Sequence, residues 1–342
     1  MMNHHYPTNA KNYALQNGFT LLELVLVLFL IGLLASAGLL FTDNIESQAK
    51  YDETQKRIAL IKRAIVGDLT RTVNGGPELS GFVADVGRLP LCIKELIELG
   101  EQVGATDDYE SPCATDSEFY LKLWQVDGTT GVGAGWRGPY IQAVVESDGE
   151  RRFRDGYGNG NDPDDLNFGW RWQLAKGMSD VDLSSPSSAV NVNRIQLQSD
   201  GFDISLVKDD VPGDGSGFLI GDDWLYPDGE ASEAAIRVDF RLDNALSKTP
   251  VSIEAALVRP EVNGNFLSMP LSAATAISLS SSGVTAYSEV FEFNQALPMG
   301  RYSFRLSCSA SGVPTASCVP ANYLLTILPR QTLAPLEFRI IP

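Results

Sequence analysis

Hydrophobic and polar residues separate most sharply at the start of the chain. Residues 1–18 are mostly polar, whereas residues 19–41 are mostly apolar and carry a single charge, at Glu23. A helix needs ~20 mainly apolar residues to cross a bilayer, and a secretory signal peptide has a shorter apolar region followed by a cleavage site. The pattern therefore predicts a membrane-spanning helix over residues 19–41. Glu23 is either a carboxylate that reaches the membrane interface or a functional group, because an ionised side chain inside a membrane is costly.

The helix is expected to continue beyond the membrane, because no proline occurs between residues 19 and 76. One face of its second half is apolar at spacings of three and four, at Ile58, Ile61, Ile65 and Leu69. That spacing is typical of an amphipathic helix. We therefore predict one long helix over residues 19–72, ended by the turn signals of residues 73–77, whose second half packs against a globular head.

The head is expected to span residues 73–225, which are rich in Gly, Asp and Trp and contain only short apolar runs. These runs indicate a short helix around residues 93–99 and strands at residues 119–124 and 195–198.

The character of the chain changes at residue 226, because charges become fewer and alternating apolar and polar residues appear. Alternation predicts strands, here at residues 236–242, 251–258, 289–293, 302–306, 323–328 and 336–341. We predict a β-sandwich over residues 226–342, for which an immunoglobulin-like topology is one arrangement. The alternative is that these strands extend the sheet of the head. The expected fold class is α+β.

Composition excludes several functions. There are 43 acidic and 26 basic side chains, which give a net charge of −17, whereas a nucleic-acid-binding protein needs a basic surface. An apolar share of 44% excludes wholesale disorder. The only histidines are His4 and His5, at the extreme N-terminus, which excludes a His-based catalytic triad or zinc site.

The segment Gly18-Phe19-Thr20-Leu21-Leu22-Glu23-Leu24 opens the apolar helix. It resembles the cleavage and methylation motif of type IV pilins and type II secretion pseudopilins. The resemblance implies that residues 1–18 are a leader, and that a prepilin peptidase cuts after Gly18 and methylates the new N-terminal Phe19. Cleavage exposes a positive α-amino group, with which the Glu23 carboxylate of a neighbouring subunit pairs strongly at low dielectric. Such a pair sets the register between subunits.

The same resemblance implies a location and partners. We expect a single-pass protein of the bacterial inner membrane, in contact with lipid before assembly and with its head in the periplasm. An inner-membrane assembly platform then builds it, together with other pilin or pseudopilin subunits, into a periplasmic or extracellular filament. Three head segments are similar to major-pseudopilin heads, namely residues 82–90, 135–140 and 155–159.

Four cysteines allow three pairings. Proximity in sequence favours Cys92 with Cys113 and Cys308 with Cys318, and disulfides suit an oxidising periplasm or cell exterior. The alternative is reduced, buried cysteine. A metal site is not indicated, because the chain has no CxxC spacing and no nearby histidine.

Two clusters of Asp, Asn and Gly, at residues 155–165 and 199–223, are candidate calcium sites, because calcium takes six to eight oxygen ligands. The second cluster resembles the calcium loop of major pseudopilins, which nominates Asp203, Asp214, Asp222 and Asp223. The alternative for both clusters is solvated turns without a metal.

Three functions compete. The favoured one is a structural subunit, a minor pilin or pseudopilin, of a type IV pilus or type II secretion pilus. The second is an adhesin or binding module that acts through residues 226–342 and uses the pilin part as its mount. The third is an enzyme, which we do not expect, because the sequence contains no nucleophile elbow, phosphate-binding loop or metal triad.

Overall fold

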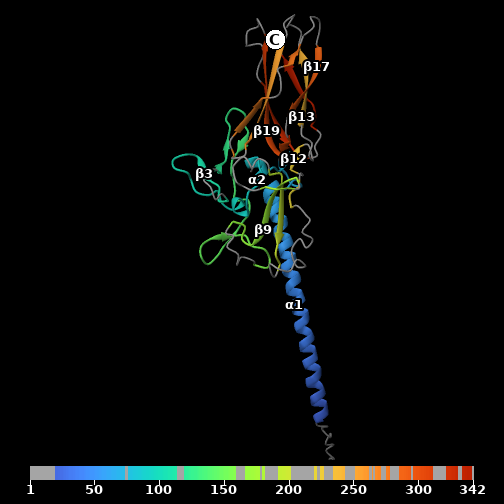
Figure 1. Ribbon diagram of the computed structural model, residues 1–342. Coiled ribbons are helices and arrows are strands. Elements are labelled where there is room, and N and C mark those ends of the chain that lie inside the picture. Colours follow the sequence, from blue (N-terminus) through green and yellow to red (C-terminus); the bar gives the residue numbers. More distant parts are fainter. Residues whose placement is uncertain are drawn as a thin grey trace, which may run out of the picture. The chain divides into compact units, whose positions relative to one another are not determined.

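The computed structural model shows an α+β protein, in which an N-terminal helix precedes many small β-sheets (Figure 1). Residues 1–50 and 51–342 form two compact units, which are described separately. The structure describes residues 20–73, 76–113, 119–158, 166–177, 179–181, 192–201, 219–221, 224–226, 234–242, 251–261, 264, 266–270, 275–277, 285–293, 296–310, 321–329 and 333–340.

Helix α1 runs from Leu21 to Val66. Thr20 caps its start, because the Glu23 N–H donates to Thr20 Oγ1 at 3.2 Å. The helix ends before residue 72, where the sequence predicted its end, because Gly67 adopts a left-handed φ of 81°. Its N–H closes the last turn on the carbonyl of Arg63 at 2.8 Å.

Among the described residues, no helix is long and apolar enough to cross a membrane. The span over residues 19–41 stays a prediction.

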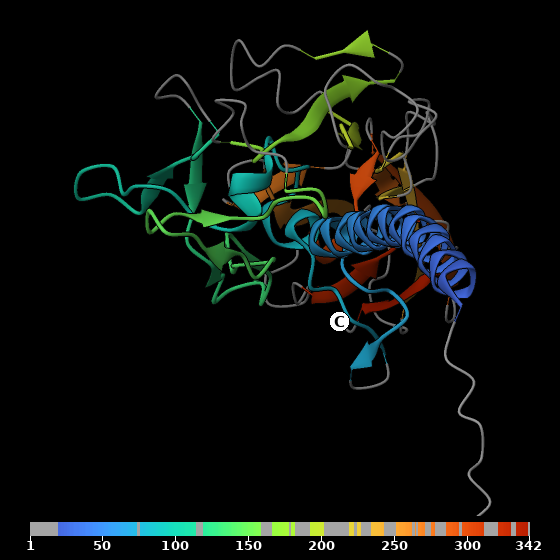
Figure 2. The same cartoon turned by 90° about the horizontal axis from the view of Figure 1, so that it is seen from below.

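The end of α1 provides one wall of the core in residues 51–342. Ile61 and Ile65 are fully buried and Ile58 packs against the same cluster, so the predicted apolar face is confirmed at these positions. Leu69 lies beyond the helix and is exposed. The core that Ile61 and Ile65 help to form also contains Phe82 of the short helix α2. This helix lies beside the end of α1 (Figure 2).

The remaining head elements are short. The predicted helix at residues 93–99 is a 3-10 turn, η1, at Ile93–Leu96, and α2 at Phe82–Val86 was not predicted. Strands pair antiparallel as β1 (Thr72–Val73) with β2 (Gly76–Pro77), β3 (Asp108–Glu110) with β4 (Tyr120–Lys122), β5 (Gln125–Val126) with β6 (Gly133–Ala134), and β7 (Val144–Val145) with β8 (Arg151–Arg152). A three-stranded sheet has the order β10-β9-β11, formed by Ser179–Asp180, Trp170–Lys176 and Arg194–Ser199.

Two sheets dominate the C-terminal region. One has the order β17-β13-β21, formed by Thr285–Phe293, Ala234–Leu242 and Leu336–Ile340. The other has the order β15-β14-β19-β20, formed by Phe266–Pro270, Val251–Pro260, Gly300–Ala310 and Ala321–Ile327, with β16 (Thr275–Ile277) also paired to β14. All six predicted strands are present, and β15 and β16 are additional.

Side chains connect the two sheets. The rings of Phe291 on β17 and Phe304 on β19 meet edge to face, with centroids 5.8 Å apart. At another position the Tyr323 hydroxyl on β20 donates to the carbonyl of Glu337 on β21 at 3.0 Å. Both aromatic rings of the first contact are buried, so they provide apolar burial between the sheets.

The head and the C-terminal sheets are joined by backbone pairing. The predicted boundary between residues 225 and 226 falls inside β12 (Leu225–Tyr226), which pairs with β18 (Leu297–Pro298). The Met299 N–H also donates to the carbonyl of Trp224 at 2.8 Å. Residues on both sides of the boundary therefore share one short sheet.

Candidate functional site

The first candidate site is the start of α1. Its large apolar side chains between Leu21 and Leu34 are all between 43 and 82% exposed, and Glu23 is exposed among them. An apolar surface of this extent marks a site of interaction with a protein or a membrane. The acidic side chain in the first turn also complements the positive end of the helix dipole. Gly18 and Phe19 lie outside the described residues.

The second candidate site is the head, in which a disulfide bond cross-links two segments of the chain. Cys92 and Cys113 are bonded, with their Cα atoms 5.7 Å apart, as the sequence predicted. The bond closes a loop of the chain that contains η1 and β3. Cys318 and the side chain of Cys308 are outside the described part of the structure, so their pairing stays a prediction.

A buried ion pair lies beside this disulfide. The Arg88 guanidinium donates to both carboxylate oxygens of Glu95, at 2.8 and 2.7 Å. The same carboxylate accepts from the Leu91 N–H at 2.9 Å and from the Ser111 hydroxyl at 2.5 Å. A buried charge needs this degree of compensation. Its signal in the sequence is the presence of Arg88, Lys94 and Glu95 in the otherwise apolar residues 88–97.

A second cluster forms around Asp85 on α2. Its Oδ2 accepts from Arg137 Nε at 3.1 Å and from the Tyr140 hydroxyl at 3.0 Å. Burial raises the pKa of Asp85 to about 6, although Arg137 and Tyr140 both favour its charged form. Burial and the neighbouring Asp85 carboxylate also raise the pKa of Tyr140 above its ordinary value.

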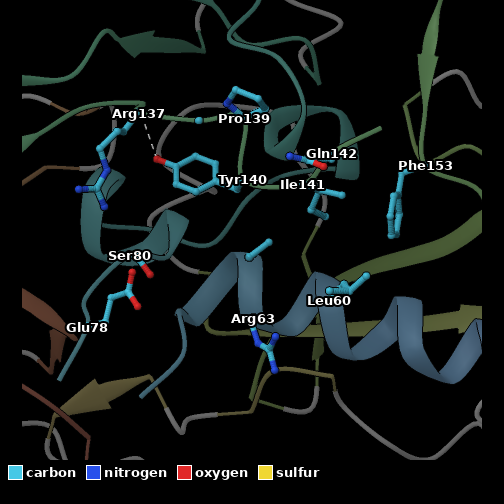
Figure 3. A pocket seen from close by; sticks show the side chains of 12 residues that line it. Leu60, Arg63, Glu78, Ser80, Arg137, Pro139, Tyr140, Ile141, Gln142 and Phe153 are labelled. Atoms are coloured by element: carbon cyan, nitrogen blue, oxygen red, sulfur yellow. Dashed lines mark hydrogen bonds between the residues drawn. The ribbon is translucent and has the colours of Figure 1, made fainter. Parts of the chain in front are cut away.

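Loop 137–142 forms one side of a groove of about 700 Å³, and the end of α1 forms the other (Figure 3). Leu60 and Arg63 contribute from the helix, and Phe153 and Ile141 supply apolar lining from the head. Ligand pockets typically have volumes of about 300–1,000 Å³, so the groove is large enough for a short peptide segment. Sequence reasoning did not identify it, because its walls are far apart in the chain.

The four nominated calcium ligands, Asp203, Asp214, Asp222 and Asp223, lie outside the described residues. The structure nevertheless brings the starts of the two acidic clusters together: the Ser199 hydroxyl donates to Asp155 Oδ2 at 2.5 Å, and both side chains are buried. Among the described residues, no group of three or more acidic, Cys or His side chains is arranged to hold a metal.

Comparison with known proteins identifies the start of the chain. A family model described as the prokaryotic N-terminal methylation motif matches residues 14–39. The match contains Gly18, Phe19 and Glu23, so the chain carries the prepilin-type signal of type IV pilins and pseudopilins. Comparisons with curated proteins and with solved structures find no match.

Proposed function

We propose that this protein is a structural subunit, a minor pilin or pseudopilin, of a type IV pilus or type II secretion pilus. The observation that carries the proposal is the methylation motif at residues 14–39, which contains the exposed apolar start of α1. A prepilin peptidase cuts after Gly18 and methylates Phe19. The role is structural, without catalysis.

Assembly follows from the chemistry of the first helical turns. Before assembly, the apolar side chains from Leu21 to Leu34 lie in the inner membrane, with the head in the periplasm. In the filament they pack against the helices of neighbouring subunits, which removes apolar surface from water or lipid. The new amino group of Phe19 then pairs with the Glu23 carboxylate of a neighbour, and this offsets the cost of burying either charge alone.

The head and the two C-terminal sheets follow this helix in the chain. We propose that the two sheets form a β-sandwich, which the Phe291–Phe304 contact supports. A domain of this bulk favours a low-copy position, because it would crowd every position of a dense filament. Its use as an adhesin stays the alternative prediction, as does calcium binding at residues 199–223.

The first test is the mass of the N-terminal peptide of the protein purified from its own cells. We expect a peptide that begins at Phe19 and carries one added methyl group. An intact leader would contradict the proposal, because Glu23 would then have no processed N-terminus to pair with.

The second test compares two carboxylates on the same helix. Glu23→Ala should still be cleaved, but its recovery in sheared filaments should fall by about tenfold or more, the scale expected for one unpaired buried charge. Glu46→Ala is the matched control, since Glu46 forms an exposed ion pair with Lys50 and exposed pairs contribute little. Equal incorporation of both variants would exclude the proposed pairing.

A further inference from the structure

The groove between the end of α1 and loop 137–142 has a distinctive charge pattern. Three ion pairs lie at or beside it, and in each the arginine is far more exposed than its carboxylate. The exposed fractions are 62 and 16% for Arg63 with Asp68, 67 and 24% for Arg71 with Glu78, and 43 and 3% for Arg137 with Asp85. The surface therefore presents guanidinium groups, on a chain whose net charge is −17.

Two of these arginines have side-chain nitrogen donors that make no hydrogen bond to a described residue. Arg63 and Arg71 meet their carboxylates through Nε, at 3.4 and 3.1 Å, and within the described residues their terminal nitrogens have no partner. A guanidinium presents five donors and binds a further carboxylate in a two-pronged manner. Arginine is also enriched at the centres of protein interfaces.

The lining of the groove combines these charged groups with apolar side chains, which an inorganic anion would leave uncovered. Leu60 lies on α1 one turn before Arg63 and is 47% exposed, and Ile141 and Phe153 provide buried apolar surface. Side chains at spacings of three and four share one helix face. Leu60 and Arg63, both labelled in Figure 3, thus line the groove from neighbouring turns of the helix.

The other wall of the groove, loop 137–142, is ordered by side-chain contacts within the subunit itself. Arg137 stacks on Trp124, 4.8 Å from the ring centroid, and bonds Asp85. Tyr140 accepts from the Arg137 N–H at 3.1 Å and donates to the same carboxylate. A wall that is already ordered costs little entropy when a partner docks.

We propose that this groove receives an acidic segment of the neighbouring subunit in the filament. Its carboxylates would bind Arg63 in the lining and Arg71 beside it, which pairs with the lining residue Glu78, and its apolar side chains would contact Leu60. The inference rests on the proposed filament function. A groove on one subunit filled by a different surface of the next makes a head-to-tail contact, and such contacts generate open helical filaments.

The test uses the full chain, expressed in its own cells with a photo-crosslinking phenylalanine derivative at position 60. We expect a crosslink to a filament subunit, mapped by mass spectrometry to an acidic segment of that subunit. Combined Arg63→Glu and Arg71→Glu should lower the crosslink yield by about tenfold or more, because two charge-assisted bonds become repulsive. Arg237→Glu is the control for a change of charge, since Arg237 is exposed on β13 and is not part of the groove.

Each result has a defined meaning. Methylated Phe19 and intact filaments, without a subunit crosslink from position 60 or without any effect of the two reversals, would overturn the groove inference alone. A crosslink to a protein outside the filament would overturn it too. An unprocessed leader would overturn the proposed function and this inference together. Each variant should keep the Cys92–Cys113 disulfide, which reports that the head has folded.

Discussion

Arg88 and Glu95 form a two-pronged ion pair whose side chains are only 4 and 0% exposed. Glu95 also accepts from Ser111, close to Cys113, so the pair ties the chain before the disulfide loop to the end of that loop. A buried pair of this kind contributes less net stability than its geometry suggests, but breaking it is expensive.

Removal of one partner should therefore be more damaging than neutralisation of both. Arg88→Met leaves the Glu95 carboxylate buried without its cation, and we expect a loss of about 3–5 kcal/mol in the free energy of unfolding. Arg88→Met combined with Glu95→Gln removes the uncompensated charge and should be more stable than Arg88→Met alone. Urea unfolding of the full chain in detergent, followed by tryptophan fluorescence, measures both. A double variant less stable than Arg88→Met would contradict this account.

The disulfide should contribute through the loop that it closes. With a sequence separation of 21 residues, the chain-entropy model gives about 3 kcal/mol. Cys92→Ser combined with Cys113→Ser should lower the free energy of unfolding by this amount. Wild-type protein unfolded under reducing conditions is the control and should show a similar loss, whereas no difference between oxidised and reduced protein would refute the prediction.

Asp85 should make the stability depend on pH in a recognisable direction. Its pKa is about 6 in the folded protein, against an ordinary value of 3.8 for an aspartate side chain. Between these values the folded state binds more protons than the unfolded state, so the free energy of unfolding falls as pH rises from about 4 to 6. The total is on the order of 3 kcal/mol, at 1.36 kcal/mol for each pKa unit.

Asp85→Asn isolates this effect from the other carboxylates, several of which have lowered pKa values and act in the opposite direction. The difference in stability between wild type and Asp85→Asn should shift in favour of the variant as pH rises through this window. Parallel pH profiles for the two proteins would show that Asp85 does not titrate there.

The close approach of Gly81 to the end of α1 should not tolerate a side chain. A Cβ at this position would lie 2.5 Å from the carbonyl oxygen of Ile65 and 2.6 Å from the carbonyl carbon of Val66. Since both atoms are backbone, the helix end or α2 must move. We expect Gly81→Ala to cost at least about 1–3 kcal/mol.

Gly128→Ala is the matched control, because a Cβ there would meet nothing within 4 Å. Its effect on the free energy of unfolding should stay within about 0.5 kcal/mol. Thermal or urea unfolding of both variants tests the prediction. Equal stability of the two variants would exclude tight backbone packing between Gly81 and the end of α1.

Local patterns in the sequence determined much of this protein. The methylation motif, the apolar start of α1, the buried face at Ile61 and Ile65 and the strands of the C-terminal sheets all follow from neighbours in the chain. Hydrophobic periodicity and side-chain alternation are read within a few residues, so no knowledge of the fold is needed. The end of α1 was predicted too late, because Gly67 was not recognised as its terminator.

Tertiary structure alone decided the contacts between distant residues. Asp85 and Arg137 are 52 residues apart, and Asp155 and Ser199 are 44 apart, yet each pair shares a hydrogen bond. The arginine-rimmed groove likewise needs the end of α1 and loop 137–142 to meet. Such contacts depend on how the core closes around residues that have no periodic relation to each other. The sequence by itself therefore determined which processing signal the chain carries and where its elements lie, whereas only the packed fold decided which charges are buried and which line the groove.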